Sequence, residues 1–411
     1  MSFQTGLSGL NASAKNLDVI GNNIANSNTV GAKSSRAEFS AVVASAIGPS
    51  GGGGAGGSGI GVEVSTISQQ FSQGTINITG NNLDCAINGG GFFELTLKDG
   101  SSAYTRDGQF KLDSKGNLIT NSGASVMGFL PDATGTSYSA SPSKLVIPTG
   151  APIAAKATSA ITAGFNLDAR AAIATPAAPS ASMLPPYSTY GTTMNAFDAQ
   201  GVSVPVKMYF IKTAADAWDI YDGDPAGTPA GANLGSLTFD KSGNILTPIA
   251  PLSMTLTSTN PNIATFPVTL DVSKATQYGT SFAISDLTQD GYTAGTLTGI
   301  SISEQGVITT RYSNGQSQST GKLALADFRN VQGLKPVGQG NWVESPTSGQ
   351  PIQGAPGQGN FGTINSGSLE ASNIDLTAEL VAMMTAQRDY QSNAQTIKTQ
   401  DTVLQTLVNL R

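Results

Sequence analysis

The chain has 411 residues and a formal net charge of −6, and only 12% of its residues are charged, against roughly 25% in an average soluble domain. It contains no histidine and one cysteine, which excludes Ser-His-Asp and Cys-His catalysis, HExxH zinc hydrolysis, internal disulfides and cysteine-rich zinc sites. The acidic balance indicates no attraction to nucleic acid or to an anionic membrane, and no run approaches the ~18 apolar residues of a membrane span.

Residues 1–28 are predicted to form a helix. Their apolar residues recur at alternating spacings of four and three, which is typical of one face of a helix, and an asparagine-rich stretch ends the pattern. The first residues lack the basic region and the long apolar core of a cleaved signal peptide. The predicted apolar face consists of Phe3, Leu7, Leu10, Leu17 and Ile24.

Residues 29–70 are predicted to be a linker that contains a Gly-rich, low-complexity segment at 48–61. A phosphate-binding loop would need Gly-Lys-Ser/Thr after the glycines and a helix behind them. The residues that follow, Val62 to Ile67, alternate like a strand instead. The segment is therefore interpreted as a flexible linker.

Short alternating stretches separated by turn signals predict β-sheets from residue 62 to about 365. An Asp/Asn-x-x-Gly pattern recurs at Asp113–Gly116 and Asp240–Gly243, with looser echoes ending at Gly201 and Gly315. We interpret these as β-hairpin turns and not as partial calcium loops, because no glutamate follows at the EF-hand offset. Cys85 lies among apolar residues and is predicted to be buried.

Composition divides this β region into two predicted domains. Residues 71–147 and 284–357 carry the denser strand signals and are expected to form an inner β domain, with a second linker at 358–367. Residues 148–283 are expected to form an outer β domain inserted into the inner one. An acidic cluster within 216–224 could serve a glycosidase or bind calcium, but it lies in a Gly/Pro-rich loop and is interpreted as solvated. No catalytic residue, cofactor or metal ligand is predicted.

Residues 368–411 are predicted to form a second, longer helix, which Asp375 is placed to cap. Apolar residues follow steps of four and three, which is a heptad register. A helix of about 35 residues is ~50 Å long and must bury such a stripe on another long partner. We therefore expect the terminal helices to pair as a coiled coil and to leave part of the stripe for neighbouring molecules. The stripe contains Leu376, Leu380, Met383, Tyr390, Ala394, Ile397, Leu404 and Val408.

The expected fold is thus mainly β with α-helical termini, in nested, discontinuous domains. Low charge suits surfaces that lie against copies of themselves, and a head-to-tail contact that does not close generates a helical filament. These features predict a self-assembling structural subunit, with a secreted β-rich adhesin as the second hypothesis.

Residues 11–31 resemble the N-terminal signature of bacterial flagellar rod and hook proteins, and residues 367–376 and 386–394 resemble their C-terminal signature. Residues 397–411 resemble the ending of the hook member of that family. One departure is Ala32, where the family has an aromatic residue. The signature positions in the first segment include Asn22, Asn23, Asn26, Thr29 and Gly31.

The resemblance implies a structural subunit of the flagellar hook, a short curved tube that acts as a universal joint between the motor's rod and the filament. A distal rod subunit is the alternative, although rod proteins are shorter and lack a large insert. The implied partners are copies of the chain itself, the distal rod protein, the hook cap protein, the hook–filament junction protein and the flagellar type III export apparatus, with neither nucleic acid nor membrane insertion. The implied location is extracellular, in the flagellum, after export without a cleaved signal peptide.

Overall fold

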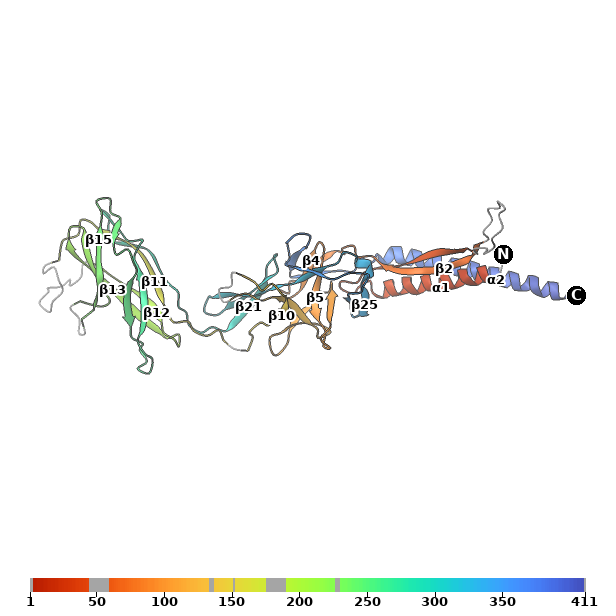
Figure 1. Cartoon of the computed structure of the whole chain (residues 1–411), viewed down its shortest axis with the longest axis horizontal. Helices are drawn as coiled ribbons and strands as arrows, with labels where there is room; N and C mark the ends of the chain where they lie inside the picture. Colours follow the sequence, from red (N-terminus) through yellow and green to blue (C-terminus); the bar gives the residue numbers. More distant parts are fainter. Residues whose placement is uncertain are drawn as a thin grey trace. The chain divides into compact units, whose positions relative to one another are not determined.

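The computed structural model describes residues 3–43, 59–132, 137–150, 152–174, 190–225 and 230–409. Within them the chain is mainly β with one helix near each end, as predicted (Figure 1): α1 (Phe3–Ala25) and α2 (Leu376–Asn409). The expected cap of α2 is confirmed, because the Asp375 carboxylate accepts hydrogen bonds from the backbone N–H groups of Thr377 and Ala378 at 2.9 and 3.2 Å. Neither described helix is long and apolar enough to cross a membrane.

The described strands fall into several sheets, the largest of which runs through both halves of the predicted inner domain. In chain order the strands, with one short 3-10 helix η1, are β1 (Ser35–Val43), β2 (Gly59–Gln69), β3 (Ile76–Ile78), β4 (Cys85–Asn88), β5 (Phe92–Thr96), β6 (Ser102–Thr105), β7 (Phe110–Leu112), β8 (Leu118–Thr120), β9 (Ser125–Phe129), β10 (Ser143–Lys144), β11 (Ala160–Asp168), β12 (Tyr190–Phe197), β13 (Ser203–Ala214), β14 (Ala217–Tyr221), β15 (Asn233–Phe239), β16 (Ile245–Thr247), β17 (Leu252–Leu256), β18 (Phe266–Asp271), β19 (Thr276–Tyr278), β20 (Ala283–Gln289), β21 (Leu297–Ile302), β22 (Val307–Tyr312), β23 (Ser317–Leu323), β24 (Leu325–Asp327), η1 (Val331–Gly333), β25 (Lys335–Gly338), β26 (Asn341–Val343), β27 (Ile352–Gly354), β28 (Thr363–Ser366) and β29 (Ser368–Glu370).

The chain divides into two compact units. Unit 1 comprises residues 1–150, 299–311 and 317–411, and unit 2 comprises residues 151–298 and 312–316. The predicted boundary at 283/284 lies too early, because residues up to 298 belong to unit 2. Strand β20 pairs antiparallel with β11 of unit 2, from Ile161 opposite Gln289 to Asn166 opposite Ala283. Composition marks where a sequence changes character, whereas strand pairing decides to which unit a segment belongs.

Neither predicted linker is irregular where the structure describes it. Strands β1 and β2 form an antiparallel hairpin, from Ser35 opposite Gln69 to Val43 opposite Gly59, and this hairpin lies along α1. The second predicted linker contains β28, which pairs with β4. The segment is ordered despite its glycines, because β1 and β2 pack against α1. Residues 44–58 of the Gly-rich segment lie outside the described residues.

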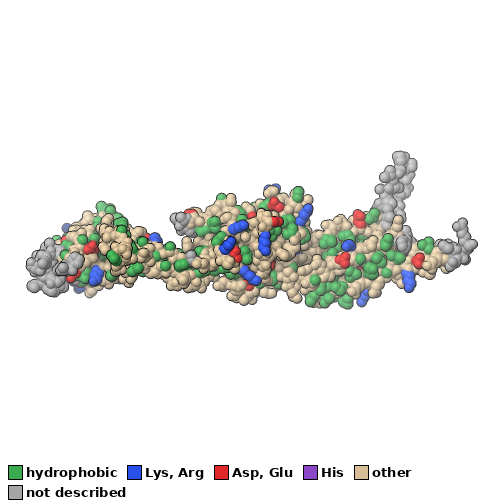
Figure 2. All heavy atoms as spheres, turned by 90° about the horizontal axis from the view of Figure 1, so that it is seen from below, with side chains coloured by type: hydrophobic (Ala, Val, Ile, Leu, Met, Phe, Trp, Pro, Cys, Tyr) green, Lys and Arg blue, Asp and Glu red, His purple; other side chains and the backbone are tan. Residues whose placement is uncertain are grey.

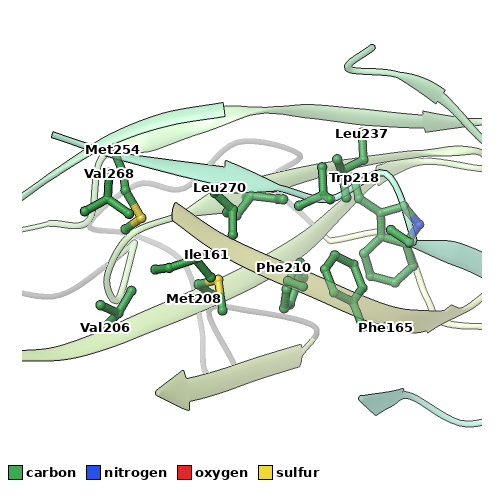
Figure 3. Packing of buried hydrophobic residues seen from close by; sticks show 14 of the residues in the cluster. Ile161, Phe165, Val206, Met208, Phe210, Trp218, Leu237, Met254, Val268 and Leu270 are labelled. Atoms are coloured by element: carbon green, nitrogen blue, oxygen red, sulfur yellow. The ribbon is translucent and has the colours of Figure 1, made fainter. Parts of the chain in front are cut away.

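Unit 2 has one large hydrophobic core between two sheets (Figure 3). One sheet has the order β12-β13-β14-β15-β16, and the other contains β17, β18, β11, β19 and β20. Side chains of β13 alternate between buried and exposed positions, as expected for a strand with one face in a core. Trp218 and Phe210 of the first sheet are fully buried against Phe165 and Leu270 of the second.

Unit 1 contains an aromatic cluster in its β part, where Phe92, Tyr104, Phe328 and Trp342 meet edge to face. Cys85 is fully buried, which confirms its prediction.

The predicted hairpin turns are also confirmed. The Asp113 carboxylate accepts N–H bonds from Lys115 and Asn117, each at 2.8 Å, and Gly116 closes that turn at a φ of 82°, where a side chain would be strained.

Candidate assembly interface

A buried charge cluster joins three distant segments of unit 1. Lys33 follows α1, Arg106 follows β6, and Glu370 ends β29 just before α2. The Lys33 Nζ lies 2.6 Å from one oxygen of Glu370, and the Arg106 Nη1 lies 3.0 Å from the other. All three side chains are almost wholly shielded from solvent. The cluster therefore fastens the segments next to both helices to the β part of unit 1.

Backbone groups satisfy most of the remaining polar atoms of this cluster. Lys33 Nζ donates to the Ser72 carbonyl at 2.8 Å, Arg106 Nη2 donates to the Gly89 carbonyl at 2.9 Å, and Glu370 also accepts from the Gly74 N–H. Burial lowers the pKa of Lys33, while its hydrogen bond to Glu370 acts in the opposite direction. Because both buried cations pair with the same carboxylate, the stability of the cluster depends on Glu370.

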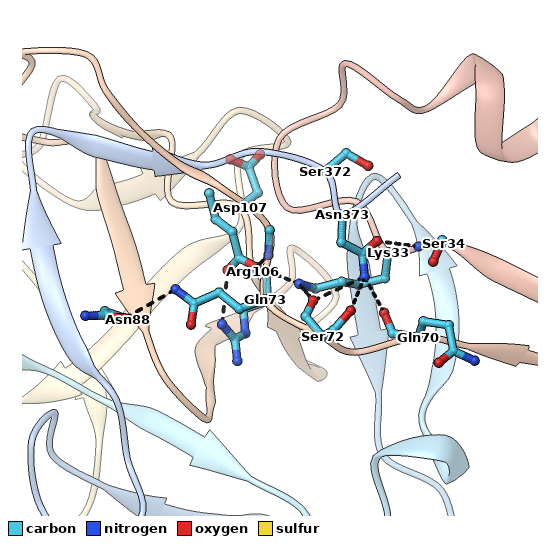
Figure 4. A network of polar contacts seen from close by, with 12 residues as sticks. Lys33, Ser34, Gln70, Ser72, Gln73, Asn88, Arg106, Asp107, Ser372 and Asn373 are labelled. Carbon is cyan, nitrogen blue, oxygen red and sulfur yellow. Dashed lines mark hydrogen bonds and ion pairs between the residues drawn. The ribbon is translucent and has the colours of Figure 1, made fainter. Parts of the chain in front are cut away.

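Two asparagines extend the same junction by hydrogen bonding to its backbone groups, and Figure 4 shows one of them, Asn373. Asn373 donates to the Gln70 and Ser72 carbonyls and accepts from the Ser34 N–H at 2.8 Å. Asn23, at the end of α1, exchanges two hydrogen bonds with the Ser35 backbone at 2.8 and 2.9 Å.

Asn23 also reaches across to α2. Its Nδ2 donates to Glu379 Oε1 at 2.9 Å. This buried amide therefore joins α1, the hairpin and α2 at one point.

The other signature residues lie in the last turn of α1 or just after it. Asn26 donates to the Asn22 side chain at 2.7 Å, and Thr29 bonds Asn26 at 3.3 Å. Gly31 has a φ of 69°, and a Cβ there would come within 2.8 Å of the backbone of Arg106. Only glycine allows the chain to pass this close to the β part.

The two helices meet through small and polar side chains. Ala12 of α1 and Ala386 of α2 are buried. The Asn393 Nδ2 donates to Ser13 Oγ at 3.2 Å, and a Cβ at Gly9 would lie 3.0 Å from the Asn393 side chain. This close contact, with the β1–β2 hairpin beside it, encloses a hollow of about 470 Å³. A helix pair of this kind gains less from apolar burial than a leucine-rich seam.

Four residues of the predicted apolar stripe of α2 are exposed. Leu376, Leu380, Tyr390 and Leu404 are between 37% and 48% exposed. Met383, Ala394 and Ile397 are partly buried, and in α1 Leu7 is exposed whereas Leu10, Leu17 and Ile24 are partly buried. The side chains of Phe3 and Val408 lie outside the described residues.

Further apolar side chains widen this exposed surface. Val381, Met384 and Val403 are each about half exposed, and Figure 2 shows hydrophobic side chains gathered over the part of unit 1 that holds the helices. We call the exposed residues of α2 the open stripe: Leu376, Leu380, Val381, Met384, Tyr390, Val403 and Leu404. Leu376, Leu380 and Met384 follow one another at steps of four along one face, and an apolar patch of this kind marks an interaction site in a soluble protein.

Sequence reasoning missed the charge cluster and the roles of Asn23 and Asn373. A signal was present, because Lys33 and Glu370 lie next to or within signature segments of a chain that has few charges. Their pairing across 264 and 337 residues could not be read from spacing. Among the described residues no cluster of three or more acidic or cysteine side chains could hold a metal ion.

Comparison with known proteins identifies the family. Residues 3–33 match the model "Flagella basal body rod protein", residues 86–164 "Flagellar hook protein FlgE/F/G D1 domain", residues 166–292 "Flagellar basal body protein FlaE D2 domain" and residues 365–410 "Flagellar basal body rod FlgEFG protein C-terminal". The described β20 at 283–289 falls inside the third of these matches.

Full-length relatives agree with these models. The chain is 40% identical over 420 residues to the flagellar hook protein FlgE of Salmonella typhimurium, covering 100% of both chains. It is 32% identical over 463 residues to that of Treponema pallidum, covering 100% of this chain and 99% of the relative. The crystal structure of Helicobacter pylori FlgE2 shares the fold, with a TM-score of 0.54 at 16% identity over 72% of this chain and 100% of that one. The chain belongs to the flagellar hook protein family, whose members are structural proteins of the flagellum and not enzymes.

Proposed function

We propose that this hook subunit assembles with copies of itself through the open stripe of α2. The observation that carries the proposal is the exposure of these apolar side chains, which α1 leaves uncovered in the single chain. The α1–α2 contact uses Ala386, Asn393 and Ile397, while Leu376, Leu380 and Leu404 remain exposed. Apolar burial is worth roughly 25 cal/mol per Å², so covering these side chains in each subunit favours a polymer.

Leu376, Leu380 and Leu404 also belong to the heptad pattern of α2, which suits a helical partner. Residues spaced four and three apart form the seam of a coiled coil, in which each side chain fits between four residues of the facing helix. We infer that the coiled-coil contact forms among helices of neighbouring copies as well as between α1 and α2. Phe3, Leu7, Leu10, Leu17 and Ile24 of α1, with Met383, Ala394, Ile397 and Val408 of α2, complete the proposed seam.

The nested order of the chain suits a flexible joint. A packed helical core near the tube axis changes length little as the tube bends, since strain grows with radius. Unit 2 lies between two parts of unit 1 in the sequence, and we place it outermost. Its weakly charged, Ser/Thr-rich surface can exchange wet contacts with neighbouring copies at low cost.

The family resemblance also suggests which other flagellar proteins the subunit contacts and how it is exported. We propose that it contacts the distal rod protein at one end of the hook and the hook–filament junction protein at the other. We further propose that it leaves the cell through the flagellar type III export apparatus without signal cleavage and adds under the hook cap protein. The resemblance of both chain ends to the family signature supports these assignments.

Substitution of an exposed stripe residue tests the assembly proposal. Leu380→Asp places a charge in an apolar contact, which costs several kcal/mol unless the charge is paired, and every subunit repeats the defect. Because Leu380 is 45% exposed in the single chain, the monomer should stay folded. We expect sedimentation to show at least a tenfold loss of polymer, with an unchanged circular dichroism spectrum.

The matched control is Gln395→Asp, an exposed position on the same helix and outside the stripe. It introduces the same charge and should leave polymer yield unchanged. Equal yields from the two variants would show that the open stripe is not the assembly interface.

A further inference from the structure

A second exposed apolar feature lies in the β part of unit 1. Strand β3 pairs only with β29 among the described strands. Beside it is a hollow of about 510 Å³, lined by the isoleucines Ile76, Ile78, Ile302 and Ile364 and by polar groups that include Glu304. Ile302 and Ile364 form a buried floor, whereas Ile78 is 87% exposed.

Because the Ile78 side chain is so exposed, its apolar surface adds almost nothing to the stability of the single chain. Its neighbour Asn77 points to the other face of β3, because side chains alternate along a strand. The apolar face and the hollow therefore lie on one side of β3, with one carboxylate in the lining. Such a surface suits an apolar side chain that is accompanied by a cation.

The β25–β26 hairpin of the same unit has that composition. All four residues of β25 are exposed, including Lys335 and Val337, and β25 is the edge strand of its sheet. Pro336 and a charged residue make edge-to-edge strand pairing unfavourable. Val337 is 50% exposed, so its side chain and not its backbone is available for contact.

The tip of this hairpin has an unusual backbone. Gly338, Gln339 and Gly340 all have positive φ, and Gln339 is the only described residue other than glycine that does. The Thr105 hydroxyl holds the turn by donating to the Gly340 carbonyl at 2.7 Å. A non-glycine residue in this region is strained and persists only where the surroundings fix it, so the hairpin presents Val337 in a set position.

We infer that the β25–β26 hairpin of one copy seats Val337 in the β3 hollow of a second copy, with Lys335 facing Glu304. The two surfaces are different patches on one chain, so the contact is head-to-tail and can repeat along a helical polymer. Charge complementarity and the matching apolar surfaces select a second copy of this chain as the occupant. The inference rests on the proposed self-assembly and adds a contact independent of the open stripe.

Substitutions at β3 test the hollow. Ile78→Asp should lower the yield of sedimented polymer at least tenfold, because the charge replaces a buried apolar contact. Asn77→Asp, the neighbouring residue on the opposite face, should polymerise as the unsubstituted chain does. Thermal melting monitors folding, which the exposure of Ile78 should preserve. If Ile78→Asp polymerises normally while Leu380→Asp does not, the proposed function stands and this inference is wrong; if the unsubstituted chain forms no polymer, both are wrong.

Cross-linking tests the pairing itself. The native Cys85 is buried, so an Ile78→Cys/Val337→Cys double variant offers one reactive pair per interface. Oxidation of its polymer should give a ladder of disulfide-linked species on a non-reducing gel, whereas its monomer and either single variant should give none. Polymer of the double variant that yields no ladder would overturn the pairing of the hairpin with the hollow.

Discussion

Replacing Glu370 by glutamine removes the one negative charge between two buried cations. The Lys33 side chain is 0% exposed and the Arg106 side chain 6%, so neither cation can reach water without opening the junction. The amide keeps the shape and can still accept from Gly74. Breaking a buried ion pair by removing one partner costs about 3–5 kcal/mol, and we expect a loss in this range for unit 1.

Urea unfolding measures this loss. For a slope of about 2.5 kcal/mol per M, a change of 4 kcal/mol lowers the midpoint by about 1.5 M. Trp342 lies in unit 1 and donates to Gln69 beside the junction, so its fluorescence reports this unit. A Trp218→Phe background removes the signal of unit 2, since the chain has two tryptophans.

Two further variants separate charge loss from general damage. Glu38→Gln makes the same change at an exposed pair with Arg36 and should barely move the midpoint, because surface pairs contribute little. Replacing Lys33, Arg106 and Glu370 together by methionine or leucine removes every buried charge, which is often neutral or stabilising. We expect this triple variant to recover most of the loss. A Glu370→Gln midpoint equal to that of the unsubstituted chain would refute the reasoning.

Other outcomes follow from single buried groups. Burial raises the pKa of Glu94, so as the pH rises the carboxyl group ionises at a lower pH in the unfolded chain than in the folded chain, and its ionisation lowers the stability of the folded state at pH 7. Glu94→Gln should therefore be more stable than the unsubstituted chain at pH 7. Urea titrations should show this gain shrinking as the pH falls towards 4. Burial raises the pKa of the Cys85 thiol to about 12, so thiol reagents should label the folded chain far more slowly than the urea-unfolded chain, and equal rates would contradict this. Gly31→Ala should destabilise unit 1 more than Gly80→Ala, because both have positive φ but only the Cβ at Gly31 meets backbone; equal melting temperatures would disprove a packing role.

Local features of the fold were predictable because their causes lie close in sequence. The Asp375 cap, the turn at Asp113 and the burial of Cys85 each depend on a few neighbouring residues. Leu376, Leu380, Tyr390 and Leu404 of the open stripe also belong to the heptad pattern in the sequence, but their exposure could not be read from that pattern. Periodicity shows that Leu376 and Leu380 share a face, whereas the fit of Ala386 and Asn393 against α1 decides which face of α2 the single chain buries.

The features that could not be predicted from the sequence depend on contacts between residues far apart in the chain. Lys33 and Glu370 are 337 residues apart, and nothing in the spacing of either residue indicates the other. The same holds for β20, which the structure assigns to unit 2 through its pairing with β11. Asn23 looked like part of a helix-ending stretch, yet it is bonded to the hairpin and to α2.

The pairing of β3 with β29 and of β4 with β28 has a kinetic consequence for a newly made chain. Nearly all of unit 2 is synthesised between the two partners of each pair. Unit 2 is almost continuous in sequence and can fold before synthesis ends, whereas unit 1 must wait for residues 363–370. High contact order also makes its closure intrinsically slow. A nascent chain therefore passes through a period in which one unit is folded and the other is still open, and its last strands set the length of that period.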